Sequence, residues 1–455
     1  MIRSCFLAGA IGALLASTAC AQIPKSAETG MNLDALYLHL HQNPELSFKE
    51  KDSATLLAAE AKSLGFKVTT GLGEEWVAAR AKKEAGYVVD GVGGYGVVAI
   101  MENGDGPTLM IRADMDALPV PERTGKAYAS TKTDEAWVTG EVPVMHACGH
   151  DVHMTVWAGV AREMAARKEE WSGTLMMILQ PGEELGLGAK AMLEDGLFER
   201  FPYPDYNLAL HVDSSAPAGV VGFVPEYAMA NVDSVDIHVH GVGGHGAYPH
   251  GSKDPIVLSS YIVTALQTLV SREVDPLQSG VVTVGKFSGG HKHNIIPDEV
   301  ELQLTVRSYT DEIRAQLLSG IERIAKAQAL SFGLPEDKMP EISIKEDYTP
   351  AVYNHPELTA RAVSAIKNAI GDDNVFQGEP VMGGEDFARY GRTDPKIPSF
   401  MFRLGAAPQE AYDAAMNGGA PLPPLHSPYF APDYEPTIKT GVISLTAAAM
   451  DILGE

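Results

Sequence analysis

Cysteine is scarce in this sequence. The 455 residues include three, and Cys5 and Cys20 fall in an N-terminal segment that we expect to be removed. Cys148 would then stand alone, so the mature chain could form no internal disulfide. A single thiol in an oxidising compartment is a hazard unless it is buried or coordinated. The cysteine count therefore predicts a protected or metal-bound Cys148.

Positive charge and long apolar runs are also lacking. The 35 Lys and Arg residues are outnumbered by 59 Asp and Glu, which gives a net charge of -24. This balance argues against nucleic-acid binding, because phosphate partners need a cationic surplus. Beyond the N-terminal segment no apolar stretch is long enough to cross a bilayer, so we expect no transmembrane span. No internal repeat or low-complexity segment is present either.

The N-terminus is typical of a secretion signal covering residues 1–21. Arg3 supplies the positive start, Phe6 to Ala19 the apolar run, and Ala19-Cys20-Ala21 a small-residue cleavage site. We therefore expect an exported protein, periplasmic or secreted. Two alternatives stay open: a buried N-terminal helix, and a lipoprotein anchored through Cys20. Ser17-Thr18-Ala19-Cys20 resembles a lipobox, although Ser17 stands where Leu is usual.

The order of elements predicts an α/β fold with an inserted second domain. Apolar strands alternate with helices, and polar residues gather at the strand ends, as in an α/β sheet with one ligand-bearing edge. From about residue 232 the order becomes β-α-β-β-α-β, the split ferredoxin-like unit. We expect residues 22–230 and 348–455 to form the main domain and 231–347 the insertion. Strands are expected at 96–101, 108–112, 174–179, 207–211 and 399–404, with insertion strands at 233–240, 280–288, 299–308 and 341–346.

Three glycines match a dinucleotide-binding pattern that we reject. Gly91, Gly93 and Gly96 fit GxGxxG, but a strand follows them, and no helix N-terminus is there to receive a pyrophosphate. A turn is the better interpretation.

Residues suited to metal binding recur along the chain. The stretch from His146 to His153 offers Cys148 and His150, and later segments offer Glu184, His211 and His426. Each of these histidines, taken singly, has an ordinary explanation as a core or surface residue. Together the five side chains form an N/O/S set suited to two first-row divalent ions such as Zn, Mn, Co or Ni. Two ions about 3.5–4 Å apart would polarise a carbonyl and activate a water molecule.

Two adjacent carboxylates favour two separate roles, one as a metal ligand and one as a general base. Glu183 and Glu184 follow a buried strand and Pro-Gly, and in an extended chain successive side chains point apart. We assign Glu184 as a metal ligand and Glu183 as the general base, which would take a proton from the metal-bound water and later give it to the leaving amine. The alternative is that both are ordinary loop carboxylates.

Eight segments in order resemble the M20 family of metallopeptidases, within it the amidohydrolase branch of hippurate hydrolases, aminoacylases and indole-acetyl-amino-acid hydrolases. The resemblance implies a catalytic α/β domain with an inserted lid or dimerisation domain, the same five ligands and the same base. The segments are 40–48, 112–119, 146–153, 180–184, 243–250, 294–297, 383–387 and His426.

The resemblance also implies roles for residues outside the metal set. His245 resembles a histidine that stabilises the oxyanion, often across a dimer, so a homodimer or higher homo-oligomer is expected. Asn294, Arg307 and Gly384 resemble substrate-binding residues, and an Arg suits a free α-carboxylate because its planar fork binds both oxygens. A plain surface charge is the alternative for Arg307.

The sequence departs from the wider family at one motif. That family carries His-x-Asp where this chain has Asp114-Met115-Asp116. We expect Cys148 to replace the missing ligand and Asp116 to keep the role of orienting a ligand histidine, while the role of Asp114 stays ambiguous. The segment from Pro121 to Val144 is longer than expected, as if an extra loop shaped substrate access.

The predicted activity is metal-dependent hydrolysis of the amide bond of an N-acyl amino acid or short peptide. A dipeptidase or carboxypeptidase of the same family is one alternative. A Cys peptidase using Cys148 is another, which the surrounding ligand set disfavours. A non-catalytic metal- or peptide-binding protein is the third, and it would have no need of the base Glu183.

Overall fold

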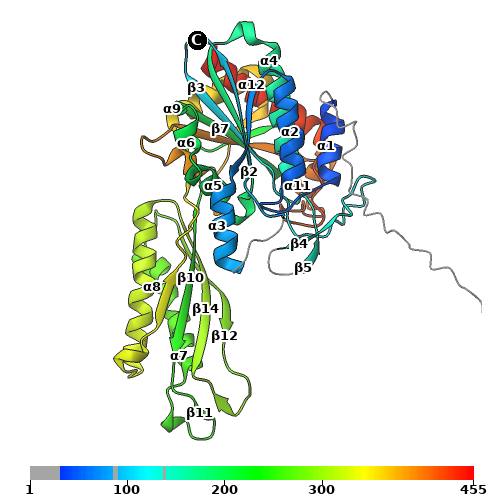
Figure 1. Cartoon of the computed structure of the whole chain (residues 1–455). Coiled ribbons are helices and arrows are strands. Elements are labelled where there is room, and N and C mark those ends of the chain that lie inside the picture. The colour runs from blue at the N-terminus through cyan, green and yellow to red at the C-terminus, as the bar shows by residue number, and fades with distance from the viewer. Residues whose placement is uncertain (1–30, 86–90, 137–139, 455) are drawn as a thin grey trace, which may run out of the picture.

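The computed structural model describes residues 31–85, 91–136 and 140–454 (Figure 1). The predicted signal segment, with Cys5 and Cys20, lies outside these residues. No helix among the described residues combines the length and the apolar character that crossing a membrane requires. Two main sheets, each with its own core, make up the fold, which confirms the predicted α/β class with an added antiparallel unit.

The larger sheet has eight strands in the order β1-β2-β6-β3-β7-β18-β8-β17. Its centre is parallel: β6, β3, β7 and β18 run in one direction. β1 and β2 continue the sheet in antiparallel fashion at one side, and β8 pairs antiparallel with β18 at the other. The strands are β1 (Lys67–Gly73), β2 (Tyr95–Asn103), β3 (Thr108–Asp114), β6 (Gly173–Gln180), β7 (Tyr206–Pro217), β8 (Val221–Phe223), β17 (Val375–Gln377) and β18 (Ser399–Ala407).

Helices cover both faces of this sheet, because alternate residues of its buried central strands are apolar on both sides. On the more extensively covered face lie α1 (Leu33–Gln42), α2 (Lys51–Ser63), α4 (His150–Ala166), α9 (Pro356–Ile370) and α12 (Tyr434–Leu453). On the other face lie α5 (Gly188–Glu194), α6 (Leu197–Arg200) and α10 (Ala388–Gly391).

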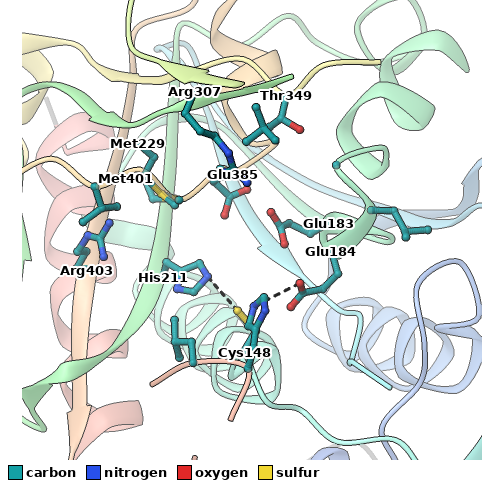
Figure 2. A pocket seen from close by; sticks show the side chains of 18 residues that line it. Cys148, Glu183, Glu184, His211, Met229, Arg307, Thr349, Glu385, Met401 and Arg403 are labelled. Atoms are coloured by element: carbon teal, nitrogen blue, oxygen red, sulfur yellow. Dashed lines mark hydrogen bonds and ion pairs between the residues drawn. The ribbon is translucent and has the colours of Figure 1, made fainter. Parts of the chain in front are cut away.

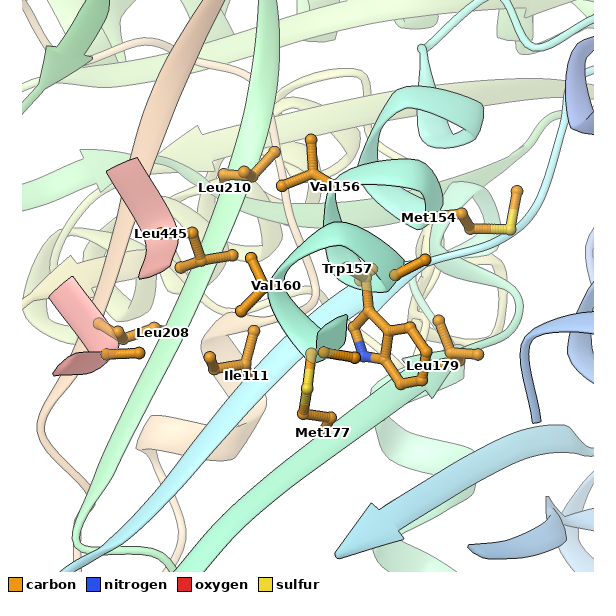
Figure 3. Close-up of a cluster of buried hydrophobic side chains, with 14 of the residues drawn as sticks. Ile111, Met154, Val156, Trp157, Val160, Met177, Leu179, Leu208, Leu210 and Leu445 are labelled. Atoms are coloured by element: carbon orange, nitrogen blue, oxygen red, sulfur yellow. The ribbon is translucent and has the colours of Figure 1, made fainter. Parts of the chain in front are cut away.

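Helix α4 is the central helix of the fold. Its first three turns are buried all round, and Figure 3 shows Trp157 of α4 among Met177 and Leu179 of β6. The residue before it, Gly149, has φ 80°, and a Cβ there would come 2.6 Å from Val212 Cγ2. Only glycine fits this turn, so the chain enters α4 at a fixed place beside β7.

The smaller sheet is antiparallel, in the order β12-β14-β10-β15, with two helices on one face. Its chain order is the predicted β-α-β-β-α-β, and β10 alternates buried and half-buried residues along its length. Figure 1 shows it extending away from the larger sheet. The domain boundaries at 230/231 and 347/348 stay predictions. The elements are β10 (Asn231–His240), α7 (Pro255–Thr268), β12 (Gly280–Ser288), β14 (Glu299–Ser308), α8 (Asp311–Ser331) and β15 (Glu341–Ile344).

Some elements differ from expectation. The strand expected at 207–211 continues to Pro217, because β18 pairs with it that far despite the polar run Asp213-Ser214-Ser215. The long segment 121–144 contains a hairpin. Elements that the pattern did not predict include β1, β8, β17 and α10, given above, and also α3 (Glu74–Ala85), β4 (Thr133–Ala136), β5 (Gly140–Pro143), β9 (Glu226–Met229), β11 (Gly244–His245), β13 (Ile295–Ile296), β16 (Val352–Asn354) and α11 (Gln409–Met416).

Candidate metal centre

The five predicted metal ligands converge at the carboxyl ends of the central strands. Their donor atoms form overlapping groups in which all atoms lie within 4.8 Å of one another. One group joins Cys148, His150 and His211, and a second joins Cys148, Glu184 and His426. Figure 2 shows the Cys148 sulfur between the His211 ring on one side and Glu184 on the other. Each of these two sets of donor atoms could surround one cation, and the two sets share the Cys148 thiol. This arrangement suits a pair of neighbouring ions.

Different elements deliver these side chains. Cys148 lies in the turn before α4, and His150 is the first residue of that helix. His426 lies in the loop between α11 and α12, where it adopts φ 65°, a conformation costly for a residue with a Cβ. Its N–H donates to Ala147 O at 2.9 Å, which ties this distant loop to the Cys148 turn. The strained backbone therefore aims His426 at the cluster.

The buried histidines have one nitrogen directed at the centre. His211 Nδ1 lies 2.8 Å from Val212 O and must donate to it, which leaves Nε2, 3.6 Å from Cys148 Sγ, as a free lone pair. His150 Nδ1 lies 3.3 Å from Asp116 Oδ1, and its Nε2 lies 3.9 Å from Glu184 Oε1. His150 Nε2 and Glu184 Oε1 are buried without a hydrogen-bond partner. A divalent cation would satisfy both atoms, so the donor set fits a metal.

Asp116 holds the turn that carries the two glutamates. It accepts the Ser47 hydroxyl at 2.6 Å and the backbone N–H groups of Glu183 at 3.1 Å and Glu184 at 2.9 Å. Burial alone would raise the pKa of Asp116, but contact with His150 and these hydrogen bonds hold it below its usual value. The arrangement agrees with the predicted orienting role.

The two glutamates do not lie in extended chain, so that premise was wrong. They form a single 3-10 turn, Glu183–Leu185, after β6. Glu184 Oε2 lies 3.5 Å from His426 Nε2, and Glu183 groups with Glu385 and Asp386, but both glutamates also group with His150. The ligand and base assignments thus stay predictions.

The carboxylates of the cluster repel one another in the absence of a cation. Burial raises the pKa of Glu184 to about 7 even though the His150 charge opposes it. The pKa of Glu183 is raised well above its usual value by burial and then by Glu385 and Glu184. A pair of divalent ions would relieve this repulsion.

Cys148 does not resemble a catalytic nucleophile. Burial and the nearby Glu184 and Glu183 charges raise the pKa of its thiol well above the usual value. A cysteine peptidase needs the opposite shift, a thiolate stabilised by an imidazolium. The neighbouring His211 has its own pKa lowered well below normal by burial and by His153.

Asp114 and His153 form a second buried layer. His153 Nδ1 lies 2.5 Å from Asp114 Oδ1, and its Nε2 accepts the Val212 N–H at 2.9 Å, so both ring nitrogens are used. Asp114 also lies 2.7 Å from Arg112 Nη1 and 3.7 Å from His150 Nε2. His153 therefore fixes Asp114 and β7 in place. In the sequence, the position of His153 in the His146–His153 stretch indicated that this residue belongs to the site, but it did not predict a role for it.

Sequence reasoning missed a buried ion network behind the turn. Arg112, fully buried, donates to Glu385 Oε1 at 2.8 Å, Asp386 Oδ1 at 3.2 Å and Gln180 Oε1 at 3.0 Å. An Arg inside an otherwise apolar strand was the available signal, because a buried charge requires partners. Through Glu385 the network reaches the cavity wall beside Glu183.

The cluster opens into a cavity of about 630 Å³. Arg307, at the junction with the smaller sheet, lines it, and its Nε and Nη1 donate to Thr305 Oγ1 at 3.0 Å and Met382 O at 3.1 Å. Gly384 lines it too, and a Cβ there would come 2.3 Å from Val232 Cγ2. Two predicted substrate-binding residues thus face the same cavity as the metal ligands.

The other two predicted residues lie elsewhere. His245 belongs to β11, which pairs with β13 next to Asn294, and both residues are exposed. Figure 1 places β11 at the end of the smaller sheet remote from the larger one. His245 Nδ1 accepts the Ala247 N–H at 3.0 Å, which leaves Nε2 free. Within one chain neither residue lines the cavity.

Comparisons with known proteins identify relatives of this chain. The family model described as Peptidase family M20/M25/M40 matches residues 110–417. Hippurate hydrolase of Campylobacter jejuni is 35% identical over 368 residues, which cover 80% of this chain and 86% of that protein. Thermostable carboxypeptidase 2 of Saccharolobus solfataricus is 34% identical over 407 residues, covering 89% and 91%. The crystal structure of Bacillus subtilis YXEP, titled a dinuclear metal binding peptidase from the M20 family, has a TM-score of 0.69 at 26% identity and covers 92% of this chain and 97% of that chain.

Proposed function

Because the chain belongs to the M20/M25/M40 peptidase family of metal-dependent hydrolases, we propose that it hydrolyses the amide bond of N-acyl amino acids. One observation carries the proposal. A single cavity is lined by four of the five metal-donor residues, by Glu183 and by Arg307, which has no carboxylate partner among the described residues; the fifth donor residue, His150, is buried next to Cys148. Amide hydrolysis of a substrate with a free carboxylate needs these three components.

Two divalent ions, held by Cys148, His150, Glu184, His211 and His426, would supply Lewis acidity and an activated water. Glu183 accepts the proton of the attacking water and later delivers it to the leaving amine. Arg307 holds the substrate carboxylate through its planar fork.

His245 and Asn294 would come from a second copy of the chain, because within one chain they are remote from the cavity. In a homodimer His245 Nε2 would steady the oxyanion of the tetrahedral intermediate. Export of the protein through residues 1–21 remains part of the proposal.

A second candidate is release of a C-terminal amino acid from a short peptide. The 34% identity to a carboxypeptidase over 89% of the chain favours it. The chemistry and the residues are the same, and the two candidates differ in whether the acyl half is a simple acid or another amino acid.

The test is a hydrolysis panel on purified, metal-analysed protein. Hippurate, N-acetyl amino acids and dipeptides would be compared at equal concentration. The proposal expects hydrolysis of N-acyl amino acids with two equivalents of metal bound. Faster cleavage of dipeptides would favour the second candidate, and no cleavage by metal-loaded protein would overturn both.

A further inference from the structure

The cavity contains a second arginine for which the proposed function has no role. Arg403 lies on β18 and is in register with His211 of the parallel strand β7. Figure 2 shows Arg403 beside Met401 on the His211 side of the cavity, opposite Glu183 and Glu184. It therefore flanks the metal site from the side away from the base.

Among the described residues Arg403 has neither a hydrogen-bond acceptor nor an ion-pair partner. Its Nη2 is buried without a hydrogen bond, and across the described ranges no ion pair of this side chain is found. The contrast with Arg112 is clear, since that buried guanidinium contacts three carboxylates. Arg403 as a whole is half-buried, but burying its Nη2 without an acceptor is costly. An anion supplied from outside the chain would remove that cost.

The two arginines divide the cavity by charge. Among the described residues that line the cavity, the lysine and arginine side chains are those of Arg307 and Arg403. Glu183, Glu184 and Glu385 line the metal end of the cavity. A substrate with one carboxylate can occupy one guanidinium fork and leaves the other unpaired. We infer that the enzyme selects amide substrates that carry two carboxylates, the second of which binds Arg403. This inference rests on the proposed function and names the substrate class within it.

The second carboxylate can come from either half of the substrate. In the amino-acid half it would be the side chain of an N-acylglutamate or N-acylaspartate. In the acyl half it would be the free end of a dicarboxylic acyl group such as succinyl. The shared chemistry is a carboxylate that meets a planar guanidinium in a bidentate contact.

The experiment uses pairs of substrates that differ only in that charge. N-benzoylglutamate is compared with N-benzoylglutamine, and N-succinylphenylalanine with its terminal amide. Wild-type kcat/KM is expected to favour the acid over the amide by roughly tenfold or more in one pair, as for a charge-assisted hydrogen bond. The pair that shows the preference identifies the half of the substrate that carries the second carboxylate.

Variants assign the preference to Arg403. Arg403→Met, similar in length and flanked by Met401, is expected to bring the acid-to-amide ratio within about twofold of one. Arg403→Lys keeps the charge but not the fork and should retain part of the ratio. Arg307→Met is the matched control, because it should weaken both members of each pair alike. Unchanged metal content and Tm show that a variant is folded.

A binding measurement separates failure of this inference from failure of the proposed function. Calorimetry on the metal-loaded Glu183→Gln protein gives the Kd of each substrate without turnover. Tighter binding of one acid than of its amide, lost in the Glu183→Gln, Arg403→Met double variant, supports the inference even if catalysis is slow. Equal Kd values for acid and amide in both pairs, or a preference that survives Arg403→Met, overturn it. Hydrolysis of hippurate alongside such a result leaves the proposed function standing.

Discussion

The histidines of the metal cavity and the histidine at the tip of the smaller sheet lie in opposite environments. His150, His153 and His211 are enclosed by the larger sheet and α4, with ring nitrogens directed by Asp116, Asp114 and Val212. His245 is exposed and has a free Nε2. One chain therefore builds and orients the metal-binding half of the site. In the proposed mechanism the oxyanion-binding half, His245, would come from a second chain.

Removal of the metal tests the enclosed half and has the largest expected effect. Treatment with EDTA, followed by desalting, should abolish hydrolysis and lower Tm, because cations that bind only the folded state stabilise it by mass action. Added Zn or Mn should restore both. Iodoacetamide on metal-loaded protein should have little effect, since Cys148 is buried and would be a metal ligand. Activity that survives EDTA but not iodoacetamide would instead point to a thiol enzyme.

Glu183→Gln separates the base from the ligands. The substitution keeps the size of the side chain and removes the proton acceptor, so kcat should fall about 10²–10⁴-fold while two metals remain bound. Glu184→Gln is the matched control in the same turn and should lose metal as well. If Glu183→Gln loses metal and Glu184→Gln does not, the two assignments are reversed.

His245→Ala tests the exposed half. Loss of one oxyanion donor should reduce kcat about 10²–10³-fold with metal content and Tm unchanged. His238→Ala is the control, because His238 is a half-buried histidine of β10, in the neighbouring four-stranded sheet, and pairs with Glu299. It should retain activity.

Mixing two inactive variants shows whether His245 acts across a dimer. A heterodimer of His245→Ala and Glu183→Gln chains contains one complete site, so mixing should recover up to about a quarter of wild-type activity. Failure to recover any activity after verified subunit exchange would contradict delivery of His245 by a partner.

The smallest expected effect concerns a histidine behind the metal site. His41 lies 2.7 Å from Asp151 and 3.2 Å from Glu122. Burial opposes its charge, but these carboxylates raise its pKa from 6.5 to about 9. Its folded pKa exceeds the unfolded one, so its stabilisation is complete below about pH 6.5 and is lost as the pH rises to about 9.

Stability measurements at two pH values check that the contribution of His41 decreases as the pH rises. The free energy of unfolding of the wild type should fall by about 1–3 kcal/mol more between pH 6 and pH 9.5 than that of His41→Gln. His39→Gln, on the same helix but without those carboxylate partners, serves as the control. A wild-type slope no steeper than that of His41→Gln would show that His41 is not charged in the folded state.

The sequence was most informative where chemistry is concentrated in short motifs. Cys148 and His150, the Glu183-Glu184 pair and the strand-borne His211 could be recognised because metal-ligand residue types stood beside clear strand and helix patterns. The order of the smaller sheet could be read from alternation in strands such as β10. These signals are local in the sequence, and the residues that carry them keep the expected positions relative to strands and helices in the fold.

Long-range contacts were not predictable in the same way. Arg112 and Glu385 are 273 residues apart, and no periodicity connects them. Arg403 is one charged residue in an apolar strand, and its missing partner becomes visible only when the strands are placed side by side. The strand expected at 207–211 stopped before the polar run Asp213-Ser214-Ser215, but pairing with β18 extends it to Pro217 because tertiary pairing overrides local propensity there.

The most direct test of the account is a crystal structure with anomalous scattering from bound metal. Two peaks a few ångströms apart, contacted by Cys148, His150, Glu184, His211 and His426 and not by Glu183, are the predicted result. The competing carboxylate group of Glu183, Glu385 and Asp386 could also hold a cation. A single peak at that group, with Cys148 and the histidines unligated, would contradict the account.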